Sequence, residues 1–96
     1  MKTFYIGRDT VRRWARIRNK FGILIDPTSI ICYTIDPNTS TISTGSMTKD
    51  SEGIYYYDYD LSGTDLPGIW QSVVTSMDSS SKKTTTVLEF EARNLW

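Results

Sequence analysis

The sequence contains no histidine and only one cysteine, Cys32. Histidine is the usual general base of enzymes and the commonest zinc ligand, and a single thiol completes neither a metal site nor an internal disulfide. We therefore expect no enzymatic activity, no cofactor, no bound metal and no small-molecule substrate. Because small exported domains usually depend on disulfides, the sequence favours assembly in a reducing compartment.

Long hydrophobic runs are also missing. No stretch approaches the roughly 18 consecutive apolar residues that a membrane span requires, and the first residues lack the apolar segment of an export signal. We therefore expect synthesis in the cytoplasm and no contact with a membrane. A length of 96 residues is typical of one domain with one core. The prediction is a single domain over residues 1–96, in which residues 93–96 are free to form an extended C-terminal tail.

What the sequence does contain is a series of alternating segments bounded by turn residues. After Gly53, Tyr55, Tyr57, Tyr59 and Leu61 fall on one face of an extended chain, which is the period of two that β-strands have. Further segments rich in β-branched or alternating apolar residues cover residues 28–35, 38–46, 69–77 and 84–93. A polar stretch over residues 78–83 is suited to a hairpin tip. Together these segments predict an all-β protein, an antiparallel β-sandwich of about seven strands.

Two parts of this pattern leave alternatives open. In residues 28–35, either the odd-numbered or the even-numbered side chains face the core, because both sets are largely apolar. Residues 9–22 fit a helix that Asp9 or Thr10 caps and Gly22 ends, but they also fit a strand in which Arg13 is the single charged residue that points inward. We favour the strand, because the neighbouring segments are all strands.

The charges of the chain are strongly segregated, although the formal net charge is zero. Residues 1–20 carry seven basic side chains against one acidic, and the remainder carries four basic against ten acidic. A basic cluster with Trp14 inside it is compatible with nucleic-acid binding. We instead favour a charge ladder on one outer sheet face and expect no nucleic-acid partner. The ladder would bring together Arg12, Arg16, Arg18, Tyr56, Asp58 and Asp60.

A molecule with such separated charges is suited to self-assembly. The positive patch of one copy can contact the negative patch of the next, which is a heterologous contact that generates rings when the rotation closes. Large aromatic side chains often dominate the energetics of such interfaces. The candidate partner-contact residues are therefore Arg12, Trp14, Arg16, Arg18, Tyr56, Leu95 and Trp96.

Short turn and strand motifs follow one another along almost the whole chain. They are Gly7-x-Asp9-x-Val11, Asp26-Pro27-Thr28, Asp36-Pro37, Ser51-x-Gly53-x-Tyr55, Pro67-Gly68-x-Trp70 and Glu89-Phe90-Glu91-Ala92. In order and spacing the chain resembles the small immunoglobulin-like proteins encoded among the virion morphogenesis genes of tailed bacteriophages. The resemblance implies a single immunoglobulin-like β-sandwich with Tyr55 and Trp70 in its core. Arg13 departs from the pattern, because its position is usually apolar, and Trp70 stands where a tyrosine is common.

The same resemblance implies a function. It predicts a non-enzymatic structural protein of the phage virion, in the capsid decoration, the neck or the tail, that binds other virion proteins and copies of itself. An alternative hypothesis is a stand-alone recognition module that binds a carbohydrate or a host protein through Trp14, Tyr56 and the loops between strands. Fold-level kinship carries function poorly, so both hypotheses need a site to support them.

Overall fold

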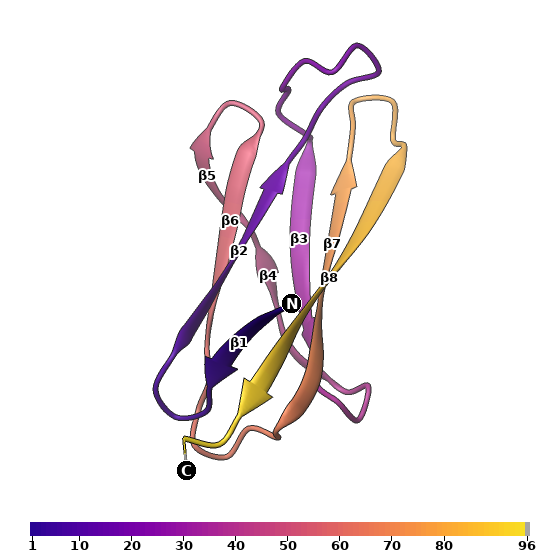
Figure 1. Ribbon diagram of the computed structural model, residues 1–96. Helices are drawn as coiled ribbons and strands as arrows, with labels where there is room; N and C mark the ends of the chain where they lie inside the picture. Colours follow the sequence, from indigo (N-terminus) through magenta and orange to yellow (C-terminus); the bar gives the residue numbers. More distant parts are fainter. Residues whose placement is uncertain (96) are drawn as a thin grey trace.

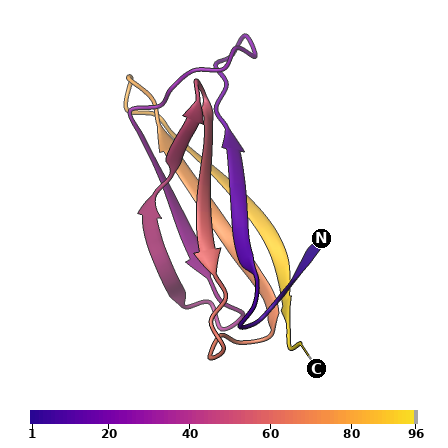
Figure 2. The ribbon, with the colours of Figure 1, turned by 90° about the vertical axis from the view of Figure 1, so that its left-hand side faces the viewer.

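The computed structural model describes residues 1–95, which form eight β-strands in two stacked sheets (Figures 1 and 2). The strands are β1 (Lys2–Tyr5), β2 (Thr10–Arg16), β3 (Ser29–Ile35), β4 (Thr41–Ser46), β5 (Thr48–Ser51), β6 (Ile54–Asp60), β7 (Gly68–Met77) and β8 (Lys83–Arg93). The five-stranded sheet has the order β1-β8-β7-β3-β4, and the three-stranded sheet has the order β2-β6-β5. The predicted all-β sandwich is confirmed. Over residues 1–95, no helix has the length and hydropathy to cross a membrane.

Two of the eight strands of residues 1–95, β1 and β5, lie outside the segments that the sequence predicted as strands. β4 pairs with β3 in the five-stranded sheet, whereas β5 pairs with β6 in the three-stranded sheet. The chain changes sheets at Met47, whose side chain is buried and whose backbone N–H donates to the Ile30 carbonyl. The sandwich is also not wholly antiparallel, because β1 runs parallel to β8.

The segment over residues 9–22 contains strand β2, so the prediction of a strand is confirmed and the helical alternative is wrong. β2 pairs antiparallel with β6, with Val11 opposite Tyr59 and Ala15 opposite Tyr55. Val11 is fully buried and Ala15 packs against the core, as the alternation of a half-buried strand requires. Gly22, the residue expected to end the helix, instead lies in a turn after β2 and has a positive φ.

The even-numbered residues of β3 face the core, which resolves the alternative left by the sequence. Ile30, Cys32 and Thr34 are all buried, whereas the odd-numbered residues of β3 remain partly accessible. The core itself has two parts. One cluster lies towards the end of the sandwich that β1 covers, and it contains Ile6, Val11, Leu61, Trp70, Phe90 and Ala92. The other lies towards the opposite end and contains Ile30, Cys32, Met47, Tyr55 and Val74.

Trp70 is the largest fully buried side chain and links the two sheets. Its ring lies 5.8 Å from the ring of Phe90 on the neighbouring strand β8 and 5.8 Å from Tyr59 on β6 in the other sheet. Phe4 of β1 completes the group with an edge contact to Phe90 at 5.7 Å. The indole N–H of Trp70 donates to the Leu66 carbonyl at 2.8 Å, so its polar atom is satisfied.

We expect Trp70→Ala to lower the free energy of unfolding by about 3 to 5 kcal/mol, because it removes aromatic contacts and leaves a cavity. Trp14→Ala provides a matched control, since the Trp14 side chain is 42% exposed, and it should cost about 1 kcal/mol or less. Chemical denaturation followed by circular dichroism measures both. Equal losses in the two variants would contradict the central position given to Trp70.

Candidate binding groove

Arg12, Trp14 and Tyr56 meet on the outer face of the three-stranded sheet, as the sequence predicted. Trp14 lies opposite Tyr56 in the β2–β6 pairing, and their ring centroids are 5.4 Å apart. The guanidinium of Arg12 lies over the Tyr56 ring at 4.1 Å and near the Trp14 ring at 5.8 Å. It also forms two hydrogen bonds to Asp58, at 2.7 and 2.8 Å, so the patch is internally satisfied.

This patch is poorly suited to stacking against a sugar ring. A carbohydrate platform needs an open aromatic face, but the guanidinium of Arg12 covers the face of Tyr56. The rings of Trp14 and Tyr56 are also tilted by 53° relative to each other, so they do not form one flat surface. The geometry therefore gives no support to the carbohydrate alternative.

The predicted charge ladder is reduced to one ion pair, between Arg12 and Asp58. The reason is the antiparallel register of β2 and β6. This register places Asp60 opposite Thr10, with which it is hydrogen-bonded, and places Arg16 opposite the apolar residue Ile54. The basic end of β2 therefore meets the apolar start of β6, and Arg16 receives no carboxylate from that strand.

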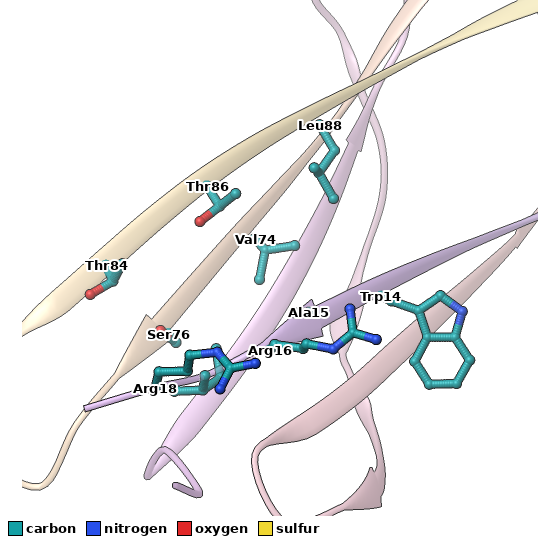
Figure 3. A pocket seen from close by; sticks show the side chains of 10 residues that line it. Trp14, Ala15, Arg16, Arg18, Val74, Ser76, Thr84, Thr86 and Leu88 are labelled. Atoms are coloured by element: carbon teal, nitrogen blue, oxygen red, sulfur yellow. The ribbon is translucent and has the colours of Figure 1, made fainter. Parts of the chain in front are cut away.

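Arg16 and Arg18 instead lie beside a groove between the edge of the three-stranded sheet and strands β7 and β8 (Figure 3). The groove has a volume of about 340 Å³. Ala15, Ile17, Val74 and Leu88 provide apolar lining, and Ser76, Thr84 and Thr86 provide hydroxyl groups. Beyond Arg18, a second hollow continues, and its charged lining residues are Arg18, Lys20, Asp78 and Lys82.

The two arginines beside the groove have no acidic partner among residues 1–95. The guanidinium of Arg18 donates to the Gly22 carbonyl at 3.0 Å, and neither Arg16 nor Arg18 forms an ion pair with a carboxylate of these residues. Arg8, Arg12, Lys49 and Arg93 differ in this respect, because each of them is paired with an aspartate or glutamate. The groove therefore combines apolar lining with two cations whose charge is uncompensated.

Strand edges border the groove on both sides. β1 pairs only with the last residues of β8, from Phe90 to Arg93, so the outer edge of β8 from Lys83 to Glu89 has no neighbouring strand within residues 1–95. β2 is an edge strand of its own sheet, and its one neighbouring strand in the described part of the chain is β6. Open strand edges present backbone N–H and C=O groups that another extended segment can pair with.

Arg13 lies between the two sheets, which confirms the prediction that it points inward. Its guanidinium donates to the Glu89 carbonyl at 3.3 Å and lies over the Phe90 ring at 5.6 Å. The Nε atom of Arg13 is buried without a hydrogen-bond partner among residues 1–95, as is the hydroxyl of Ser72. Burial accordingly lowers the pKa of Arg13. Arg13 is therefore a partly buried charge that no carboxylate compensates.

The candidate residue Leu95 lies away from the groove. Leu95 follows the C-terminal end of β8, at the opposite end of the strand from Thr84 and Thr86, and is 44% exposed. Strand β8 ends at Arg93, so the expected tail is limited to the residues after it, and the predicted contact by Trp96 falls outside the described residues.

Sequence reasoning missed the side of the groove that β7 and β8 provide. In strand β8, Phe90 and Ala92 are buried, and the same alternation turns Leu88, Thr86 and Thr84 inward as well. Two threonines where a closed core would have apolar residues are the signal that the sheets separate there.

No metal centre is apparent in the described part of the chain, where no three histidine, cysteine, aspartate or glutamate side chains gather. Cys32 is fully buried among apolar side chains, and this burial raises the pKa of its thiol to about 11. A thiol with this pKa is protonated at neutral pH and is a poor nucleophile. Cys32 therefore acts as a small core residue.

No protein-family model matches the chain, and a comparison with curated proteins finds no significant match. Among solved structures, the chain is similar to CopC from Methylosinus trichosporium OB3b, with a TM-score of 0.64. The match covers 99% of this chain and 88% of that chain at 15% sequence identity. At this level of identity the similarity supports the β-sandwich fold alone.

The comparison contradicts the predicted function. CopC is a solved structure that the chain matches and is not a component of a phage particle, so the prediction of a virion structural protein is wrong. The expected contacts with virion proteins and the expected location in the virion depended on that function, and they stay predictions without support. The family resemblance inferred from the turn motifs stays a prediction.

We expect Arg13→Met to raise the free energy of unfolding by about 1 to 2 kcal/mol, because an apolar side chain of similar length removes a partly buried, uncompensated charge. Arg16→Met is the matched control on the same strand, since Arg16 is exposed, and it should change stability by about 0.5 kcal/mol or less. Thermal and denaturant unfolding measure both variants. A clear loss of stability in Arg13→Met would show that the contacts with Glu89 and Phe90 outweigh the cost of burying the charge.

The Arg12–Asp58 pair predicts a pH dependence of stability. The hydrogen bonds from Arg12 lower the pKa of Asp58 below its ordinary value of 3.8. A carboxylate with a lowered pKa in the folded state stabilises the protein above that ordinary value, and the contribution is lost as the pH falls through the folded-state pKa. Asp58→Asn should therefore be less stable than the native chain at neutral pH, and the difference should shrink below about pH 4.

The measurement is denaturant unfolding at a series of pH values. Glu52→Gln is the control, because Glu52 is exposed and forms no ion pair among the described residues. A difference between Asp58→Asn and the native chain that persists unchanged into acid would be inconsistent with an ionic contribution from Asp58.

Proposed function

We propose that this protein is a non-catalytic binding module that takes an extended, acidic polypeptide segment into the groove between β2 and β8. The observation that carries the proposal is the pair Arg16 and Arg18, which lie beside an apolar groove without a carboxylate partner among residues 1–95. An acidic ligand would supply the charges that the register of β2 and β6 does not supply.

The lining of the groove favours a polypeptide over a nucleic acid. Ala15, Ile17, Val74 and Leu88 offer apolar contacts for side chains, and only the sides of the groove are basic. A nucleic-acid surface relies mainly on Lys and Arg contacts to phosphates and on aromatic rings that stack with bases. Trp14, the aromatic residue of the groove, already packs against Tyr56.

The open edge of β8 supports an extended conformation for the ligand. A segment that pairs with Lys83–Glu89 would gain backbone hydrogen bonds and direct alternate side chains towards Thr84, Thr86 and Leu88. Side chains on that face would reach the apolar lining, and carboxylates near the mouth would reach Arg16 and Arg18. This arrangement explains why hydroxyl groups and not a closed apolar core occupy the start of β8.

A fluorescent ten-residue peptide that alternates valine and glutamate is a direct probe. We expect it to bind the full chain, as measured by fluorescence anisotropy at low salt, and to bind at least about tenfold more weakly to Arg16→Glu/Arg18→Glu, because reversal of both charges replaces attraction with repulsion. Added salt should weaken binding to the native chain.

Three controls make the test specific. A peptide with lysine in place of glutamate should not bind. The double variant Lys2→Glu/Arg93→Glu has the same change of charge at exposed positions away from the groove and should bind like the native chain. Absence of peptide binding, or binding that Arg16→Glu/Arg18→Glu leaves intact, would refute the proposal, and tighter binding of a thymidine oligonucleotide would replace it with a nucleic-acid function.

A further inference from the structure

The outer face of the five-stranded sheet carries an unexpected number of apolar side chains. On β3, the outward residues are Ile31, Tyr33 and Ile35, which alternate with the buried residues of that strand. In an antiparallel sandwich, the face opposite the core is normally solvated and polar. Here the sheet is apolar on both faces, which is why the alternation of residues 28–35 did not reveal the inward side.

The neighbouring strands continue this outer apolar face. On β7, Ile69, Val73 and Met77 point outward, and Ile69 is 43% exposed. On β8, Val87 is 51% exposed. The register aligns Tyr33 with Val73 and Val73 with Val87, so these three residues form a row across the middle of the face. We call this face, centred on the Tyr33–Val73–Val87 row, the outer apolar face.

On β3 and β7, the order of apolar and polar side chains on the outer apolar face is symmetric about this row. On β3, an isoleucine lies two positions before Tyr33 and another lies two positions after it. On β7, the outward residues around Val73 read Ile69, Gln71, Val73, Thr75 and Met77, so apolar and polar side chains repeat in the same order from either end. A rotation of 180° about an axis that lies along the row, across the strands, would place apolar residues of one copy opposite apolar residues of another.

The charges on β8 fit the same rotation. Lys83 lies four positions before Val87, and Glu91 lies four positions after it, and all three side chains point to the outer face by alternation from the buried Phe90 and Ala92. The rotation would therefore place Lys83 of one copy opposite Glu91 of the other, twice in each dimer. Opposite charges in these positions favour this register, in which Lys83 would share Glu91 with Arg93, the partner of Glu91 within its own copy.

The geometry points to a second copy of this chain as the partner of the outer apolar face, in a symmetric dimer with the two five-stranded sheets packed face to face. Such an isologous contact buries the same patch on both copies. Aligned packing of two sheets is a standard arrangement for apolar sheet faces. Three strands over the length of β7 give a footprint on the order of 400 Å² per copy, which is below the roughly 800 Å² of stable complexes. The dimer should therefore be reversible, with a dissociation constant in the micromolar range.

This inference is independent of the proposed function, because the groove and the outer apolar face lie on different sides of β8. Thr84, Thr86 and Leu88 face the groove, whereas Lys83 and Val87 belong to the other face of the strand. A dimer of this kind would present two grooves, so one acidic ligand with two binding segments could bind both of them.

Sedimentation analysis of the full chain between about 5 and about 500 µM tests the inference, because this range brackets a micromolar constant. We expect a monomer–dimer equilibrium. Val87→Arg should weaken the dimer at least about tenfold, because two guanidinium groups would meet at the symmetry axis and lose water. Ser80→Arg adds the same charge in the exposed hairpin between β7 and β8, away from the face, and should leave the equilibrium unchanged.

A charge exchange tests the register of the dimer. Lys83→Glu should weaken association, because it places a carboxylate opposite the carboxylate of Glu91, and the double variant Lys83→Glu/Glu91→Lys should restore it. Lys82→Glu, one residue away and outside the outer apolar face, should have little effect. Circular dichroism and thermal unfolding establish that each variant is folded.

Several outcomes would overturn the inference. A native chain that stays monomeric over the whole concentration range excludes the dimer, as does a dimer that Val87→Arg leaves unchanged. A dimer that Arg16→Glu/Arg18→Glu abolishes, while Val87→Arg does not, would place the interface at the groove and not at the outer apolar face. Failure of the peptide to bind would affect the proposed function alone.

Discussion

The burial of Trp70 fixes which face of strands β3, β7 and β8 is the inner one. Its ring packs against Phe90 on the neighbouring strand and Tyr59 on the opposite sheet. The side chains of a strand alternate between its two faces, so with Trp70 buried the even-numbered residues of β7 point inward and the odd-numbered ones point outward. The pairing with β3 and β8 extends this orientation to Cys32 and Phe90, and it leaves Tyr33 and Val87 on the outside.

The two ends of the sandwich differ because this aromatic contact exists at only one of them. Around Trp70 the sheets are joined by large rings, and β1 covers the edge of β8. Towards the other end, Thr84 and Thr86 replace rings on the inner side of β8, and the space beside them is the groove. Arg13 lies between the two regions, with its guanidinium over Phe90. A sandwich closed at one end and open at the other is the physical basis of the binding role that we propose.

The sequence predicted the strands well where only one face of a segment is apolar. In β6, the tyrosines at 55, 57 and 59 alternate with more polar residues, and the structure turns them towards the core. In β3 both faces are apolar, so periodicity could not identify the inner one. The prediction of the charge ladder was wrong for a different reason. Which residues of β2 and β6 lie opposite each other depends on the register of the two strands, and turns far away in the sequence establish that register. The groove could not be predicted, because its existence depends on the distance between the two sheets, which no local sequence pattern encodes. The virion function came from family resemblance and not from a site.

The parallel pairing of β1 with β8 gives the fold a mechanical property. Tension that draws the chain before β1 and the chain after β8 apart would act along both strands in opposite directions. The backbone hydrogen bonds that join Lys2–Tyr5 to Phe90–Arg93 lie across this direction, so the load would be shared among them and they would have to rupture together. A pair of strands that is peeled apart, so that its hydrogen bonds break one after another, resists less force, and the parallel pairing of β1 with β8 avoids this. The sandwich is therefore built to resist stretching along its long axis.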